Sequence, residues 1–323
     1  MKVFIPSLDQ FVRKDHPYRQ ILELVDFKEL THELEDCYSD IGRGGYPVDT
    51  AFKCLLLQYA EDLSDRELER FLEENVAGKL FCGFGLGDKT PDFSYFSVLR
   101  KRIGIEKLAN LFNRVRDSLK SAGLIREIFT FVDATKLVSK MSTWADRDKA
   151  IKEGLEKFNN ATAARIAKDK EARFGCKGKD KFWYGYKKHV SVDMKHGLIG
   201  KVIVTPANVP DHKGLKDVCP DGGMVFGDKG YSPNESRNEL IKKGCHSGII
   251  LKNNMKGKNR DKDRWLTKVR MPYEGVFSKG SGRARYCGVI KNQFQAIMES
   301  LAFNFKRLAR IASPPLVLCP IKA

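Results

Sequence analysis

The chain has 323 residues, and 42% of them are hydrophobic, which is enough for a large core and indicates one large domain with a smaller one. Lys and Arg total 58 against 41 acidic residues, so the net charge of +17 favours a nucleic acid partner over a basic protein that binds none. The sequence shows no run of about 18 apolar residues and no signal-peptide pattern, which argues against a membrane or secreted protein and predicts a cytoplasmic, nucleoid-associated one.

Helical patterns fill the first part of the chain. Apolar residues mixed with acids predict short helices up to about residue 45, and glycines within 42–47 then interrupt the pattern. Ser64 with Glu67 three residues later is a capping box that predicts a helix start. Thr90, followed by proline, predicts another start, which leads into helices over 93–103 and 105–122.

Three basic residues, Arg100, Lys101 and Arg102, end the helix expected over 93–103. Together with the two helices before it, this helix resembles a helix-turn-helix whose last helix lies against DNA. The same cations also offset the negative end of the helix dipole. The pattern leaves both interpretations open.

After residue 125 the pattern changes to that of strands. Apolar runs at 128–132 and 223–227 end on Asp133 and Asp228, and a further strand is expected at 247–251. Two β-rich runs, 182–193 and 198–205, are joined by a short turn and predict a hairpin. These features predict an α/β fold with a mixed sheet. Charged residues dominate a stretch of about 144–181, predicted to be helical or disordered and outside the core, and a helix is expected over 290–308.

The two aspartates at strand ends suggest a metal site. A carboxylate beside a buried strand needs compensation by a cation or by hydrogen bonds. Oxygen ligands without His or Cys favour Mg²⁺ or Mn²⁺. Eight cysteines include no CxxC pair and no zinc-ligand spacing, so reduced thiols are expected.

A third ligand is expected from a helix, and Glu274 lies among apolar residues four positions after Arg270. If one helix contains both, they share a face. Pro272 between them predicts that the helix starts there, leaving Arg270 just outside it. Two metal ions held by three carboxylates activate the attacking oxygen and stabilise the leaving oxygen of a displacement at phosphorus. Glu299 is the rival third carboxylate, and its position favours a solvated helix face.

Each acid taken singly is more typical of a turn or a cap, and other residues have two interpretations as well. Asp211 and its neighbours Asn208 and His212 are explained by turn hydrogen bonds. His189 is expected at a surface position on a strand, with a DNA contact as the alternative. The aromatic residues within 183–186 are expected in the core, with stacking on unpaired bases as the alternative.

Four motifs resemble the bacterial insertion-sequence transposases with a DDE triad and an RNase H-like core, closest to the group named for insertion sequence five. The likeness covers nearly the whole chain, because 42–103 is similar to that family's N-terminal helical domain. Asn304 to Leu308 also matches the end of its terminal helix. The four motifs span residues 131–135, 185–193, 204–211 and 226–231.

The resemblance implies a triad of Asp133, Asp228 and Glu274 that binds Mg²⁺ or Mn²⁺, with two ions expected. It implies metal-dependent cleavage at terminal inverted repeats and strand transfer into target DNA. The partners are then double-stranded DNA and further copies of the chain, as a homodimer or higher oligomer on DNA. Thr267 and Ser281 stand where the family has a tyrosine and a lysine, and Lys279 is the substitute for that lysine. DNA contacts are expected from Arg270, Lys229, Lys279, Arg100, Lys101 and Arg102.

The expected domains are a helical one over 1–125 for DNA ends and dimerisation, an RNase H-like DDE catalytic domain over 126–311, and a tail over 312–323. Two other functions compete with transposition. One is a domesticated or inactive derivative that only binds DNA, for which binding is sensitive to salt and indifferent to magnesium. The other is a metal-dependent nuclease without strand transfer.

Overall fold

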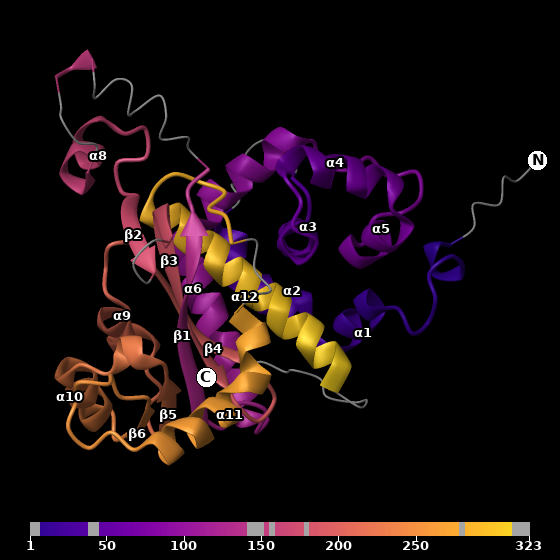
Figure 1. The fold of residues 1–323 in the computed structure, drawn as a ribbon. Helices are drawn as coiled ribbons and strands as arrows, with labels where there is room; N and C mark the ends of the chain where they lie inside the picture. Colours follow the sequence, from indigo (N-terminus) through magenta and orange to yellow (C-terminus); the bar gives the residue numbers. More distant parts are fainter. Residues whose placement is uncertain are drawn as a thin grey trace, which may run out of the picture. The chain divides into compact units, whose positions relative to one another are not determined.

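A computed structural model describes residues 7–37, 45–140, 152–154, 159–177, 181–277 and 282–311 (Figure 1). They belong to two compact units, the first comprising 1–122 and 297–323 and the second 123–296. The first division lies close to the domain border expected after residue 125. The second division differs from the expected end of the catalytic domain at residue 311. The residues from Ile297 onward group with the first unit, where Phe305 lies edge-on to Phe27 with ring centroids 6.0 Å apart. The tail expected over 312–323 lies outside the described residues.

Helices build the described part of the first unit, and their buried faces carry large apolar side chains such as Phe52, Leu68, Phe81 and Phe96. α12 (Val289–Ile311) begins in the second unit and continues into the first. The other helices are η1 (Leu8–Gln10), α1 (Pro17–Leu24), α2 (Phe27–Thr31), η2 (His32–Cys37), α3 (Val48–Ala60), α4 (Asp65–Glu74), α5 (Val76–Cys82) and α6 (Phe93–Ser121).

Local capping explains two of these helix starts. The predicted capping box is confirmed, since the Glu67 N–H donates to the Ser64 side chain and the Ser64 N–H donates to the Glu67 carboxylate. The prediction that Thr90 caps the next helix is wrong. Asp92 caps α6, because its carboxylate is the group that accepts the first free N–H groups of the helix. Gly104, at φ 67°, kinks α6 between the two helices expected there.

The sheet of the second unit is mixed. Its strands are β1 (Phe129–Val138), β2 (Arg173–Lys177), β3 (Lys181–Asp193), β4 (Ile199–Pro206), β5 (Met224–Gly227) and β6 (His246–Ile249). β3 pairs antiparallel with β1, β2 and β4, whereas β5 runs parallel to both β1 and β6. The predicted mixed α/β sheet with flanking helices and the predicted hairpin of β3 and β4 are confirmed. The helices of this unit are α8 (Asn160–Ile166), α9 (Asp211–Val218), η3 (Lys229–Tyr231), α10 (Asn234–Lys242) and α11 (Arg260–Phe277).

The course of β1 differs from the expected one. The prediction that this strand ends on Asp133 is wrong, because β1 continues to Val138 and pairs with β3 along the whole extension. β5, in contrast, ends beside Asp133. Asp133 therefore lies inside β1 and next to the end of β5. On the face opposite Asp133, Val132 packs with Leu215 of α9 and Leu240 of α10 in a buried cluster.

The charged stretch around 144–181 contributes to the core, contrary to expectation. Within its described part, Ala163, Ala167 and Ala172 are fully buried in a cluster with Leu137 and Tyr186. Small alanine side chains let the segment pack closely while Lys168, Lys170 and Glu171 face solvent. The hydrophobic pattern of the sequence did not predict this burial, because alanine gives little hydrophobic contrast with its neighbours.

Asp169, in this stretch, is a buried acceptor that joins three parts of the second unit. Its carboxylate accepts hydrogen bonds from the Tyr186 hydroxyl at 2.6 Å and from the Gly288 N–H at 3.2 Å. Glu171 accepts from the Val289 N–H at 2.5 Å, so the start of α12 is capped from this stretch. In the described ranges no helix combines the length and the apolar character that a membrane span requires.

Replacing Asp169 by alanine is expected to lower the free energy of unfolding by about 3 kcal/mol, because the Tyr186 hydroxyl and the Gly288 N–H lose a charged acceptor in a buried place. Urea denaturation measures this change. Asp217→Ala, at an exposed position of α9, is the control and is expected to change the value by less than about 0.5 kcal/mol. Equal effects of the two substitutions would contradict the role of Asp169.

Candidate active site

The pairing of β1 with β5 brings two aspartates together. The parallel register places Phe131 opposite Phe226, and two residues further along each chain come Asp133 and Asp228. Neighbouring strands lie about 4.8 Å apart, so the two carboxylates share one end of the strand pair. The charge of Asp228 also acts on Asp133, as the pKa of Asp133 shows.

Asp133 is a carboxylate in a poorly solvated position. Burial raises its pKa to about 6, and the negative charges of Asp228 and Asp211 add to this, while the Ala134 N–H and Lys177 act in the opposite direction. The Ala134 N–H donates to Asp133 Oδ1 at 2.8 Å. A divalent cation supplies the compensation that this carboxylate lacks.

Asp228 is held by the turn that follows β5. Its Oδ1 accepts the Gly230 N–H at 2.7 Å and thereby caps η3. A Cβ on Gly230 would lie 2.9 Å from Asp228 Oδ1 and 3.1 Å from Asp211 Oδ2. The absence of a side chain at residue 230 therefore lets a third carboxylate approach. Asp211, at the start of α9, is itself paired with Lys187 at 2.7 Å.

Glu274 and Arg270 share one face of α11. The prediction that Pro272 leaves Arg270 outside the helix is wrong, since α11 continues through Pro272. A proline inside a helix removes one backbone donor and crowds the carbonyl four residues earlier, yet α11 does not end there. Arg270 Nη2 lies 3.5 Å from Glu274 Oε1, and the Glu274 side chain is 52% exposed.

α11 also contacts the site face of the sheet. The Arg270 guanidinium lies over the Phe131 ring at 5.3 Å, and Phe131 and Asp133 point to the same side of β1 because they are two residues apart. Arg270 is buried, and its Nε and Nη1 have no hydrogen-bond partner. A cation with free donors therefore lies on the side of the sheet to which Asp133 points.

The structure thus brings two of the three predicted ligands together. Asp133 and Asp228 are neighbours, whereas Glu274 faces Arg270. Within the described ranges, no three His, Cys, Asp or Glu side chains are close enough to hold a metal ion. The donor set of two adjacent carboxylates, one with a raised pKa, still fits a hard divalent cation.

The residues expected to contact DNA have different surroundings. Lys229 is exposed directly after Asp228, and Lys101 and Arg102 are exposed on α6. Arg100 instead makes a bidentate ion pair with Asp65, with N–O distances of 2.8 and 2.5 Å. Asp65 therefore neutralises the charge of Arg100 within the first unit. Lys279 lies outside the described residues.

Sequence reasoning misplaced His189. The expected surface position is wrong, because His189 is fully buried between β3 and α9, with Nε2 2.9 Å from Thr205 Oγ1. Burial lowers its pKa to about 4. β3 pairs on both edges and is covered on both faces, so its sequence lacks the alternation that marks a half-exposed strand.

Tyr231 is a second residue of the site that sequence reasoning did not single out. It is fully buried, and the charges of Asp133, Asp211 and Asp228 add to burial in raising the pKa of its phenol. Its place within the motif 226–231 was the available signal. The expected burial of Tyr184 and Tyr186 is confirmed, and both hydroxyl groups donate to Asp169.

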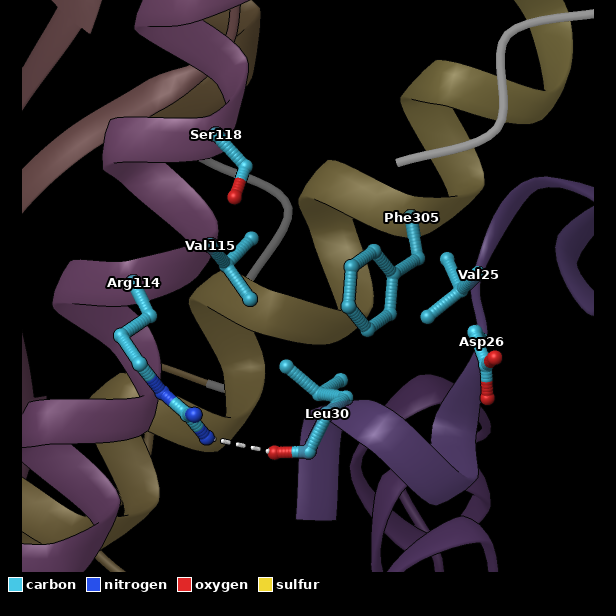
Figure 2. A pocket seen from close by; sticks show the side chains of 7 residues that line it. All are labelled: Val25, Asp26, Leu30, Arg114, Val115, Ser118 and Phe305. Atoms are coloured by element: carbon cyan, nitrogen blue, oxygen red, sulfur yellow. Dashed lines mark hydrogen bonds between the residues drawn. The ribbon is translucent and has the colours of Figure 1, made fainter. Parts of the chain in front are cut away.

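A pocket in the first unit contains little that serves catalysis (Figure 2). Its one cation is Arg114, which donates to the Leu30 carbonyl at 2.7 Å and pairs with Glu33 at 3.0 Å. The Phe305 ring and the Val25 side chain form an apolar wall, as Figure 2 shows. The lining residues are Val25, Asp26, Leu30, Arg114, Val115, Ser118 and Phe305.

Comparison with known families decides the class of protein. The family described as Transposase DDE domain matches residues 130–304. The chain belongs to this family. A second match, Transposase domain (DUF772), covers residues 6–102 of the DDE transposase, in the helical first unit. No solved structure matches the chain.

The family confirms the predicted function class. A DDE transposase is a DNA-cleaving, strand-transferring enzyme of mobile elements, its partner is DNA, and its chemistry depends on a divalent metal ion. The prediction of an insertion-sequence transposase is confirmed, whereas membership of the group named for insertion sequence five stays a prediction.

The raised pKa of Asp133 predicts how the stability of this DDE transposase varies with pH. The carboxyl titrates near 3.8 when unfolded and at about 6 when folded, so between these values the folded chain binds more protons. Without metal, the contribution of Asp133 to the free energy of unfolding should fall by about 3 kcal/mol as the pH rises through this window.

Urea denaturation of the wild type and of Asp133→Asn from pH 4 to pH 7 measures this contribution. Asparagine does not titrate, so the variant should gain stability relative to the wild type as the pH rises. The exposed Asp261→Asn is the control and should follow the wild type. A constant difference between wild type and Asp133→Asn would show that Asp133 titrates normally.

Proposed function

We propose that this transposase cuts DNA at terminal inverted repeats and joins the freed ends to target DNA, using Asp133, Asp228 and Glu274 as ligands for two Mg²⁺ or Mn²⁺ ions. The observation that carries the proposal is the register of β1 and β5, which sets Asp133 beside Asp228. When bound, the ions activate the attacking oxygen and stabilise the leaving oxygen of a displacement at phosphorus.

The protein groups have distinct tasks in this proposal. Asp133 and Asp228 fix the position of the site, because the Ala134 and Gly230 N–H groups hold one oxygen of each. Water is the first nucleophile, and the 3′-hydroxyl that cleavage releases is the second. One site serves both steps, because each is a displacement at phosphorus.

Glu274 joins the site by leaving Arg270. Their 3.5 Å contact is longer than the roughly 2.8 Å of a strong charge-assisted hydrogen bond, and the Glu274 side chain is half exposed. The contact is long and the Glu274 carboxylate is open to solvent although Arg270 is buried, so bound cations can compete for Glu274. Arg270, released on the same face, then has its guanidinium free for a DNA phosphate.

Two further features are proposed with the reaction. Because two element ends are cut and joined together, the active form is a homodimer or a higher oligomer on DNA. The excess of basic residues draws the protein to DNA, which in a cell means the nucleoid.

Alanine at Asp133, Asp228 or Glu274 is expected to lower the cleavage rate by about 1,000-fold or more, because the ions lose a ligand, while DNA affinity stays within about threefold. The assay is cleavage of labelled DNA carrying the element ends, in Mg²⁺ or Mn²⁺. Asp261→Ala, an exposed acid on the same helix as Glu274, should retain activity.

The Glu274 proposal would fail if its alanine variant cut DNA as fast as Asp261→Ala does. Binding without cleavage by the wild type in both metals would indicate a derivative that only binds DNA. Cleavage without joining would indicate a nuclease.

The contrast between Arg100 and Lys101 tests DNA binding by α6. Lys101→Ala should weaken DNA binding and reduce the slope of log affinity against log salt by about 1, with unchanged stability. Arg100→Ala should instead lower the free energy of unfolding by about 2 kcal/mol, because Asp65 loses its cationic partner although it keeps the hydrogen bond from Gln58. Fluorescence anisotropy at several salt concentrations and urea denaturation give the two readouts. A wild-type salt slope in Lys101→Ala would remove α6 from the DNA interface.

A further inference from the structure

Tyr231 has a fixed position beside Val132 and Gly227, the residues that precede the two aspartates in the sequence. It is the last residue of η3 and follows Asp228 by three residues. Its ring is fully buried in the cluster that contains Val132 and Leu215. A Cβ on Gly227 would lie 3.3 Å from Tyr231 Cδ2, so the glycine before Asp228 makes room for the ring. The packing leaves the phenol little freedom to move.

The Tyr231 hydroxyl is buried and has no hydrogen-bond partner. A buried tyrosine hydroxyl normally finds one, as those of Tyr184 and Tyr186 do at Asp169. An unpaired donor held in a rigid core therefore requires an explanation. The group that it serves is either absent from the resting protein or moves toward it when the site is in use.

The charges around this hydroxyl are those of the site. Burial raises the pKa of Tyr231 well above its usual value, and Asp133, Asp211 and Asp228 raise it further, in that order. A tyrosine phenol is protonated at neutral pH, so this hydroxyl is a hydrogen-bond donor. Asp211 already has Lys187 as a partner, whereas Asp133 and Asp228 each receive one backbone N–H.

We propose that Tyr231 is a positioning residue whose hydroxyl donates a hydrogen bond to the Asp133 and Asp228 pair when these carboxylates bind a divalent cation. The donor fixes the orientation of the carboxylate oxygens without touching DNA. Hydrogen bonds of this kind to metal ligands commonly control affinity and rate. This inference rests on the proposed metal site.

Tyr231→Phe removes only the oxygen and tests the proposal. Without metal the variant should unfold at the same temperature as the wild type or higher, because the lost hydroxyl had no partner. Tyr184→Phe is the matched control. It removes a buried hydroxyl that donates to the Asp169 carbonyl at 2.7 Å, so it should unfold at a lower temperature and leave the site intact.

Metal binding is measured on the full chain by electron paramagnetic resonance of free Mn²⁺. Tyr231→Phe should bind Mn²⁺ about 10-fold more weakly than the wild type, and Tyr184→Phe should bind it unchanged. In DNA cleavage at saturating Mn²⁺, Tyr231→Phe should lower kcat with little change in KM for DNA, because the hydroxyl acts on the metal ligands.

The outcomes separate this inference from the proposed function. If the wild type binds Mn²⁺ and Asp228→Ala does not, wild-type affinity and kcat in Tyr231→Phe would overturn the role of Tyr231 alone. If the wild type shows no Mn²⁺ binding that depends on Asp228, the proposed metal site and the role of Tyr231 both fail. A large loss of metal-free stability in Tyr231→Phe would show that the hydroxyl is structural.

Discussion

The site depends on the parallel pairing of β1 with β5. These strands are far apart in the sequence, yet their register sets Asp133 and Asp228 side by side. A shift of one residue would turn every side chain of one strand to the other face. Val132 and Val225 prevent such a shift, because both are fully buried in the cluster beneath α9 and α10. The packing of apolar side chains on one face thus determines the position of the carboxylates.

Much of this arrangement could be predicted from the sequence. The strands around Asp133 and Asp228, the hairpin of β3 and β4, and the terminal helix all follow from hydrophobic patterns that tertiary contacts reinforce. The four sequence motifs indicated the transposase family. Register between distant strands is not encoded in any local pattern, so the closeness of the two aspartates was inferred only from their similar settings.

The errors in prediction have physical causes. His189 has the polar character of a surface residue, but its strand lies in the middle of the sheet, where both faces are covered. Pro272 suggested a helix start, yet neighbouring turns keep α11 continuous around it. Ala163 and Ala167 are too small to produce a hydrophobic signal, although they are fully buried. The orientation of Glu274 depends on its pairing with Arg270, which spacing alone does not determine.

The capping of α12 by Asp169 and Glu171 also affects the order of folding. Gly288 and its partner Asp169 are separated by 119 residues, so the chain must close a long loop before this contact can form. Contacts of such high sequence separation form slowly, whereas the β3 and β4 hairpin forms from neighbouring residues. During synthesis, the Asp169 carboxylate therefore lacks this backbone partner until the ribosome has added Gly288, 119 residues later.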